Sequence, residues 1–264
     1  MQENSVDAIP AETDLFGPIM EQTVLLKEQH REYLPMSILQ DGHPIEFMVK
    51  GADQLYLDLN DSWMRFLVKF VNAAGADVGA DLVGPIKLIA HALFAQISAE
   101  LNGKQVGDTN NYYHYKAYIQ TLINYCKETQ DTRLLAEGWT KDTSGQMGIT
   151  VCANNGANTG LRARVVRMNN STVVEYIMRP HFDIFQQDRL IPPGIDLHLK
   201  LIPNAANFVC KTTAPGDNAV QIAYKPHISF AGLYIKPKQL TNEAELAHRA
   251  PIRERVMRLP HTRV

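Results

Sequence analysis

The chain has 264 residues, of which 45% are hydrophobic and 20% are charged. This composition argues against a disordered or fibrous protein and predicts one large domain or two small ones. The formal net charge of −2 gives no whole-chain reason to expect a nucleic-acid-binding or membrane-surface protein.

The amino-terminal segment 1–40 mixes prolines, glycine and charges without a sustained hydrophobic period. We therefore predict an extended amino-terminal arm over residues 1–40, which gains order only by lying against another surface. No amino-terminal run joins a positive start to an apolar stretch, and nowhere do 18 apolar residues follow one another. The sequence thus predicts a soluble intracellular protein with no signal peptide and no transmembrane helix.

Three segments alternate apolar and polar residues, which is typical of half-buried strands. Ser62–Val71 places Met64, Phe66, Val68 and Phe70 on one face. Leu93–Leu101 puts Leu93, Ala95, Ile97, Ala99 and Leu101 on one face and runs into Asn102-Gly103, a pair that favours a two-residue hairpin. Ile195–Leu201 alternates most regularly and follows the turn residues Pro192, Pro193 and Gly194.

Weaker patterns predict further strands over Pro44–Val49, Leu55–Leu59, Leu161–Met168, Thr172–Met178, Asn207–Lys211 and Ala219–Ile235. The last of these contains Pro226, so it is either two strands or one strand interrupted by a bulge. Helical periodicity is scarce by comparison.

One amphipathic helix is predicted over Asn111–Cys126, where Tyr112, Tyr115, Ile119, Leu122 and Tyr125 recur at spacings of three and four. This stripe favours packing on a sheet or contact with another subunit over ligand stacking. Residues 127–160 resemble a long surface loop with Trp139 as an anchor. A shorter helix is predicted over Thr241–Arg249 and is limited by Pro251.

Together these elements predict an all-β protein, an antiparallel jelly-roll sandwich of about eight strands with one inserted loop helix at about 111–126. Residues 41–240 form the jelly-roll domain. Residues 241–264 form a basic tail or linker that carries Arg249, Arg253, Arg255, Arg258 and Arg263. This tail suits a solvated face, an acidic protein surface or phosphate.

The residues that usually carry catalysis are not arranged in any familiar spacing. Neighbouring histidines are never closer than thirteen residues, so the His-x-His pair of metal-binding jelly rolls is impossible. The three cysteines, Cys126, Cys152 and Cys210, lie far apart, which argues against a disulfide framework or a cysteine zinc site. Gly-x-Ser-x-Gly and the glycine-rich nucleotide loops are missing from the sequence. We therefore expect no enzyme, no catalytic residues, no cofactor and no metal site.

Several short runs occur in one characteristic order. They are Asp14-Leu15-Phe16, Pro44-Ile45-Glu46-Phe47, Val83-Gly84-Pro85-Ile86, His91-Ala92-Leu93-Phe94, the segment Asn111–Tyr125, Thr143-Ser144-Gly145 and His181–Asp188. Over roughly residues 14–258 this series resembles the amino-terminal half of the major capsid proteins of Polinton (Maverick) elements and adintovirus-like viruses.

The resemblance implies a structural double jelly-roll capsid protein in the virion, made in the host cytoplasm or nucleus. Two barrels would stand side by side, and three copies would form a capsomer of an icosahedral shell. The implied partners are further copies of the chain, as a homotrimer if the second barrel is present, and other capsid proteins. The resemblance implies no small-molecule substrate and no membrane contact, and leaves direct nucleic-acid binding open.

Two points stay open at this level. The family continues past Pro251–Val264 into a second barrel, so the chain is either the first half of such a protein or a single jelly-roll penton or minor capsid protein. A carbohydrate- or ligand-binding module built on Tyr112–Tyr118 and residues 127–160 is the alternative function. The residues we expect at an assembly interface are Tyr112, Tyr115, Trp139, Arg249, Arg253, Arg255 and Arg258.

Overall fold

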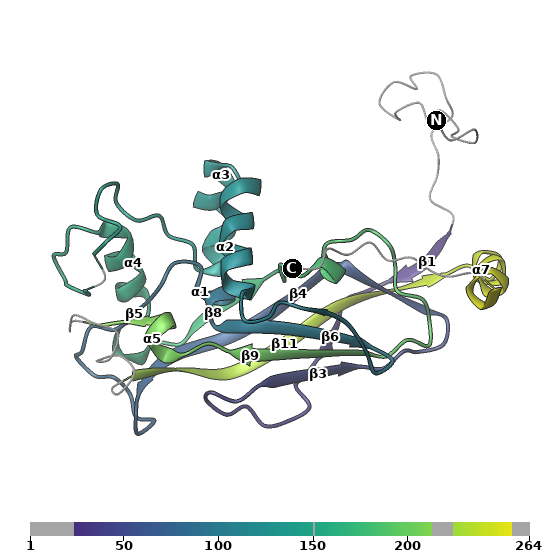
Figure 1. The fold of residues 1–264 in the computed structure, drawn as a ribbon, viewed down its shortest axis with the longest axis horizontal. Helices are drawn as coiled ribbons and strands as arrows, with labels where there is room; N and C mark the ends of the chain where they lie inside the picture. Colours follow the sequence, from purple (N-terminus) through teal and green to yellow (C-terminus); the bar gives the residue numbers. More distant parts are fainter. Residues whose placement is uncertain (1–23, 150, 213–223, 255–264) are drawn as a thin grey trace, which may run out of the picture.

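The protein is a sandwich of two antiparallel sheets with helices on one side and at both ends (Figure 1). The computed structural model describes residues 24–149, 151–212 and 224–254, with side chains up to His248 in the last range. Within these ranges, no helix has the length and hydrophobicity needed to cross a bilayer.

The larger sheet has the order β1-β11-β4-β8, and β2 also pairs with β11. Its strands are β1 (Leu25–Glu28), β2 (Arg31–Tyr33), β4 (Leu55–Asn72), β8 (Val174–Met178) and β11 (Tyr224–Leu240). The second sheet has the order β3-β9-β6-β7, with β3 (Ile45–Val49), β6 (Phe94–Leu101), β7 (Lys104–Asp108) and β9 (Leu197–Pro203). A short third ladder joins β5 (Gly84–Pro85) to β10 (Cys210–Lys211).

The core lies between the two larger sheets and follows the predicted alternation. The inward side chains of β4 are Met64, Phe66, Val68 and Phe70, and all are fully buried. Phe47, Leu199 and Ile97 meet them from the second sheet, where they belong to the same hydrophobic cluster. Phe66 and Phe94 bring their rings to a centroid distance of 5.2 Å. The predicted two-sheet antiparallel sandwich is therefore confirmed.

The predicted hairpin joins β6 to β7. Asn102 and Gly103 have φ values of 48° and 72°, so both take the left-handed conformation that a two-residue turn of this hand requires. One detail of the prediction is wrong, because Phe94 is buried where the alternation favoured Ala95. A register shift between Phe94 and Gln96 changes the phase of the strand at its start.

The segment around Pro226 forms one long strand. Strand β11, which the structure describes from Tyr224 onward, pairs with β4 along most of its length. Its register shifts between Ile228 and Phe230 and again between Tyr234 and Lys236. The bulged single strand is therefore the correct alternative. Residues 219–223 of the predicted strand lie outside the described residues.

Two strand predictions are wrong in whole or in part. Leu161–Met168 belongs to helix α4 (Thr159–Arg167), where the Asn158 side chain caps the helix by accepting from the Leu161 backbone N–H. Leu161 and Val165 are buried one turn apart, so the pattern also fits a helical face. Asn207–Lys211 divides between helix α5 (Ala206–Val209) and β10.

The predicted loop over residues 127–160 contains two helical turns, α3 (Lys127–Asp131) and η2 (Arg133–Glu137). Trp139 anchors it as expected, because the indole is only 2% exposed and packs with Leu88 and Leu134. The Lys87 ammonium lies 4.4 Å from its ring centroid. The fold is therefore richer in helix than the single inserted helix we predicted.

Both ends of the described chain lie next to β11. The first strands pair with it, and the last helix follows it in the sequence. Two strands of the expected arm, β1 and β2, hydrogen-bond to β11, whereas residues 1–23 lie outside the described residues. Helix α7 (Asn242–Glu254) begins directly after β11 and includes Pro251. The expected end of this helix before Pro251 is therefore wrong.

Gly138 holds the end of η2 against helix α1 (Ile89–Ala92) and provides a test of this packing. Its φ is 84°, and a Cβ atom there would lie 2.4 Å from the Ile89 Cγ2 atom. We expect Gly138→Ala to lower the free energy of unfolding by about 2–3 kcal/mol, from left-handed strain plus overpacking. The measurement is urea denaturation followed by circular dichroism.

Gly145→Ala is the matched control for this substitution. Its φ is 76°, but no described heavy atom lies within 4 Å of the added Cβ. Only the backbone strain of about 1 kcal/mol should remain. Equal losses for the two variants would show that the contact between Gly138 and α1 carries no stability.

Candidate functional site

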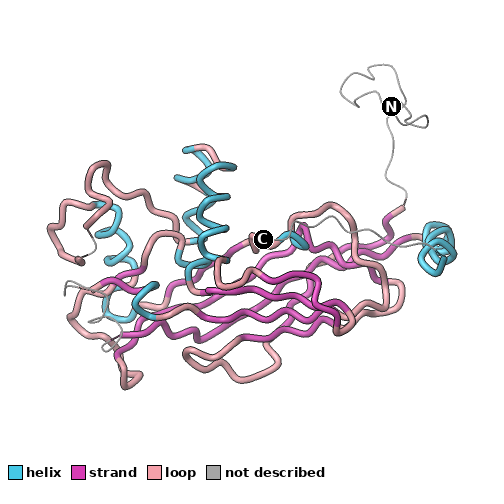
Figure 2. The backbone as a smooth tube through the Cα atoms, viewed as in Figure 1, coloured by secondary structure: helices cyan, strands magenta, loops and turns pink. Residues whose placement is uncertain are grey.

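Helix α2 (Tyr113–Asn124) stands out from the sandwich and is topped by α3 (Figure 2). Only one narrow stripe of this helix is buried, formed by Tyr113, Ala117 and Thr121 at intervals of four residues. Small side chains at two of these positions let the helix approach α1 and β6 closely. The inner face of α2 therefore depends on a column of residues that the hydrophobic pattern did not single out.

The predicted apolar stripe of α2 faces away from the protein. The exposed fractions are 60% for Tyr112, 52% for Tyr115, 53% for Ile119 and 48% for Leu122. Tyr125, the last member of the predicted stripe, is partly buried against the Trp139 cluster, and Ile123, which was not predicted, is 75% exposed. The prediction that this stripe packs on the sheet is wrong, because the Tyr113 column occupies the sheet side. The alternative in that prediction, contact with another subunit, stays a prediction. A cluster of exposed large apolar side chains is typical of an interaction surface.

A groove beside α2 extends this apolar surface. Ile86, Lys87, Leu88, Ala92, His114, Tyr115, Tyr118 and Phe208 line it. The His114 ring lies 4.4 Å from the Phe208 ring between centroids, and burial lowers the pKa of His114. A neutral imidazole thus adds to the apolar character of the groove. We call the exposed stripe of α2 and this groove together the α2 face.

Not all of the expected interface residues lie on the α2 face. Tyr112 and Tyr115 do, whereas Trp139 is buried inside the chain and cannot touch a neighbour directly. The backbone of α7 includes Arg249 and Arg253, whose side chains are not described. Arg255 and Arg258 lie outside the described residues.

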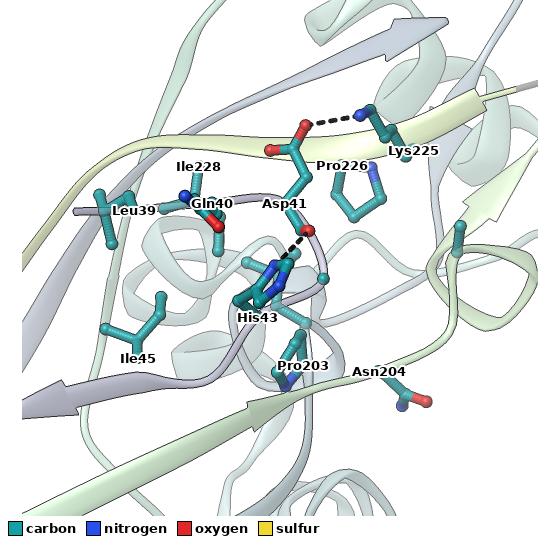
Figure 3. A pocket seen from close by; sticks show the side chains of 13 residues that line it. Leu39, Gln40, Asp41, His43, Ile45, Pro203, Asn204, Lys225, Pro226 and Ile228 are labelled. Carbon is teal, nitrogen blue, oxygen red and sulfur yellow. Dashed lines mark hydrogen bonds and ion pairs between the residues drawn. The ribbon is translucent and has the colours of Figure 1, made fainter. Parts of the chain in front are cut away.

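A cavity of about 150 Å³ opens between the two sheets near the start of β3 (Figure 3). Asp41 at its rim accepts hydrogen bonds from Lys225 at 3.0 Å and from His227 at 2.8 Å. Partial burial raises the pKa of Asp41, but these two partners outweigh it and lower the pKa overall. The Asp41 carboxylate is already paired, so it is not available to bind a charged ligand in this cavity. Its ion pairs instead join the segment before β3 to β11.

A buried polar cluster lies beneath the base of α2. The His91 ring contacts the Tyr113 hydroxyl through Nδ1 at 2.8 Å and the Glu137 carboxylate through Nε2 at 3.1 Å. His181 lies edge-on to His91, with ring centroids 4.9 Å apart, and its Nδ1 contacts the Gln120 side chain at 2.8 Å. Burial, followed by the nearby charges, lowers the pKa of His181 to about 3.

The sequence analysis missed this cluster. Its members come from well-separated parts of the chain and show no short spacing. The only signal was that His91 and His181 each lie in a run that carries the family resemblance. Their proximity depends on the path of the chain between the two sheets.

The three cysteines differ sharply in accessibility, and the exposed one, Cys126, lies two residues after the end of α2. Cys126 is exposed at the start of α3, and hydrogen bonds from Thr129 lower its pKa. Cys152 and Cys210 are buried, and burial raises the pKa of both, to about 11 for Cys152. Since the thiolate is the reactive form, Cys126 should react first.

We expect iodoacetamide to modify only Cys126 in the folded protein and all three cysteines in urea. Intact-mass spectrometry followed by peptide mapping measures the sites. Cys126→Ser is the control and should leave the folded protein unmodified. Rapid labelling of Cys152 or Cys210 without denaturant would contradict the burial that the structure shows.

Comparisons with known proteins identify one relative by sequence and several by fold. No protein-family model matches the chain. An uncharacterised protein of Caenorhabditis elegans is 21% identical over 212 residues, which are 77% of this chain and 48% of the relative. The chain therefore spans about half the length of the curated relative it matches.

Three solved viral structures share the fold. A PBCV-1 protein fitted into a reconstruction of the virophage Sputnik has a TM-score of 0.56 at 10% identity, over 88% of this chain and 46% of its own. The structure of the Sputnik virophage gives 0.55 at 9% identity, over 90% and 53%. The Faustovirus major capsid protein gives 0.53 at 11% identity, over 90% and 58%.

The predicted jelly-roll fold is therefore confirmed. Viral double jelly-roll major capsid proteins contain it, and this chain matches about half of each. That is also the fraction that the resemblance in the sequence implied.

Proposed function

We propose that this chain, which has the jelly-roll fold of viral major capsid proteins, is a structural subunit of a viral-type shell and not an enzyme. The observation that carries the proposal is that a capsid-type jelly-roll fold and an exposed apolar surface, the α2 face, occur in the same chain. A shell subunit needs a rigid sandwich and an exposed surface that neighbours can cover. Both are present in the described residues.

The α2 face has the character of a protein interface. Aromatic and aliphatic side chains dominate it, and charged groups are few apart from Lys87 at the edge of the groove. Because α2 projects from the sandwich, a neighbour can reach it without disturbing the sheets (Figure 1). A specific interface requires about 800 Å² from each partner.

The number of barrels, the oligomeric state and the viral group are inferred from the family resemblance in the sequence and from the share of each capsid protein that the chain covers. The chain matches about half of each capsid protein, which suits one barrel of a double jelly roll. We therefore infer a second barrel in the complete protein, a homotrimeric capsomer, a place in the virion and membership of the Polinton or adintovirus-like group. The tail arginines Arg249, Arg253, Arg255 and Arg258 remain proposed contacts with acidic protein surfaces.

Sedimentation velocity on the purified chain tests the proposal. Over about 1–200 μM we expect reversible, concentration-dependent species larger than the monomer, together with protection of Cys126 from iodoacetamide as association proceeds. A monomer at every concentration with Cys126 fully reactive would contradict it. Glycan binding that is lost in Tyr112→Ala or Tyr115→Ala would instead favour the carbohydrate-binding module.

A further inference from the structure

We propose that His91, Glu137 and His181 form a buried site for a divalent transition-metal ion, with zinc as the best fit. One ligand atom from each residue lies within 4.8 Å of the other two, and all three residues are buried. They come from separate parts of the chain, namely α1, the end of η2 and the segment between β8 and the turn Asp183–Phe185. Such convergence of three ligating side chains beneath one helix is the observation that carries the proposal.

The ligand types suit zinc. Two imidazoles and one carboxylate form a set that binds zinc at about 2.0–2.2 Å and leaves a fourth position for water or another ligand. At these bond lengths, neighbouring ligand atoms in a tetrahedral site lie roughly 3.3 Å apart. His91 Nε2 and Glu137 Oε2 form a hydrogen bond of 3.1 Å. An ion that displaced the proton of this bond would find the two atoms at nearly the spacing it needs. The ligand atom of His181 lies within 4.8 Å of the other two, so a small shift of this side chain completes the set.

Each histidine is oriented from its other nitrogen. The Tyr113 hydroxyl holds His91 Nδ1, and the Gln120 side chain holds His181 Nδ1, each at 2.8 Å. Outer hydrogen bonds of this kind fix the tautomer and ring orientation of metal-binding histidines. With Nδ1 engaged, Nε2 is the metal-binding nitrogen of each ring, and on His91 the ion would replace the hydrogen bond between Nε2 and Glu137.

The surroundings provide a route to the site. Two surface pockets share Asn60 and Arg179, and one reaches Glu137 while the other reaches His181. The Arg179 Nε is buried and has no hydrogen-bond partner among the described residues. Arg179 lines both pockets, so its Nε is available to donate to a water or small anion that enters them.

Two cations lie near His181. Lys116 of α2 forms an ion pair with Asp183, whereas Arg179 donates through Nη2 to the neutral Asn60 side chain, which does not offset its charge. With neutral histidines, Glu137 supplies the only negative charge among the three ligands, and bound zinc would leave the site with a charge of +1. An anionic fourth ligand would balance this charge and also match Arg179.

Metal binding would fasten the base of the α2 face. It joins α1, which lies under α2, to η2 and to the chain that follows β8. Zinc that binds only the folded state stabilises it by mass action. At a free zinc concentration 100 times Kd, we expect the melting temperature to rise by roughly 5–10 °C.

The experiment uses the purified chain after treatment with EDTA and gel filtration. Zinc is added, excess is removed by dialysis, and bound metal is measured by inductively coupled plasma mass spectrometry. We expect about one zinc per chain, the rise in melting temperature, and visible d–d absorption when Co²⁺ replaces Zn²⁺. Glu137→Gln and His181→Gln should each weaken binding by more than about 100-fold, since the loss of an outer hydrogen-bond partner alone typically costs 10–100-fold.

His198→Gln is the matched control. His198 also lies between carboxylates, at 3.4 Å from Glu46 and 3.6 Å from Glu100, but on the outer surface of the sheet. Zinc stoichiometry should not change in this variant. Circular dichroism checks the fold of each variant, and the wild-type Co²⁺ spectrum does not depend on any substitution.

Two results would overturn the proposal. One is wild-type protein that retains less than about 0.1 zinc per chain and shows no shift in melting temperature. The other is folded Glu137→Gln and His181→Gln variants that bind zinc as tightly as the wild type. Neither result decides shell assembly, which is measured by the sedimentation coefficient and not by zinc content or melting temperature.

Discussion

Replacing Ile119 and Leu122 together with lysine is expected to abolish self-association while the chain stays folded. Both side chains are about half exposed on α2, so the monomer should lose no more than about 0.5 kcal/mol for each. In a covered interface, each loses the burial of the exposed half of an aliphatic side chain, about 0.75–1.5 kcal/mol. The association constant should fall by a factor of about 10–10², before the cost of burying the new charges is counted.

Sedimentation velocity at several concentrations measures this loss. The matched control is Val166→Lys with Val173→Lys, two exposed aliphatic side chains outside the α2 face. It adds the same charge and should leave association unchanged. If the control weakened association equally, net charge and not the α2 face would be responsible, and an unchanged α2 variant would remove this face from the interface.

Replacing Arg164 with methionine is expected to cost about 3–5 kcal/mol of folding free energy. The guanidinium is buried and donates to the Pro85 carbonyl at 3.1 Å, the Thr140 carbonyl at 2.7 Å and the Asp142 carboxylate at 2.9 Å. Methionine fills most of the volume but leaves these acceptors without a donor. Lys87 remains near Asp142 at 3.9 Å and compensates only in part.

Urea denaturation of Arg164→Met and Arg162→Met separates this effect from a general change of charge. Arg162 lies on the exposed side of the same helix, and its replacement should change stability by less than about 0.5 kcal/mol. Similar midpoints for the two variants would contradict the view that Arg164 fastens α4 to β5 and the loop. A large loss confined to Arg164→Met would support it.

The strands were the most predictable part of the fold. Met64, Phe66, Val68 and Phe70 alternate with polar residues, and a strand with one buried face leaves no other register that hides them. The Asn102-Gly103 turn was equally predictable, since few other residue pairs take two left-handed conformations in succession. Both signals are contained within a few neighbouring residues.

The errors occurred where one local pattern fits two structures. Leu161 and Val165 satisfy an alternating strand and a helical face alike, and the Asn158 cap together with buried Arg164 selects the helix. On α2, the apolar stripe correctly indicated a helix, but the sheet side is taken by Tyr113, whose hydroxyl contacts His91. A pattern of hydrophobic residues cannot tell an inner face from an interface.

The amino-acid sequence alone thus determined the class of fold, the turn between β6 and β7, and the presence of α2. Only the tertiary structure decided which face of α2 is exposed and that His91, Glu137 and His181 meet. The reason is that backbone preference and side-chain alternation act between residues close in the chain. Burial and side-chain convergence depend on segments that are distant in the sequence, and packing of the two sheets brings those segments together.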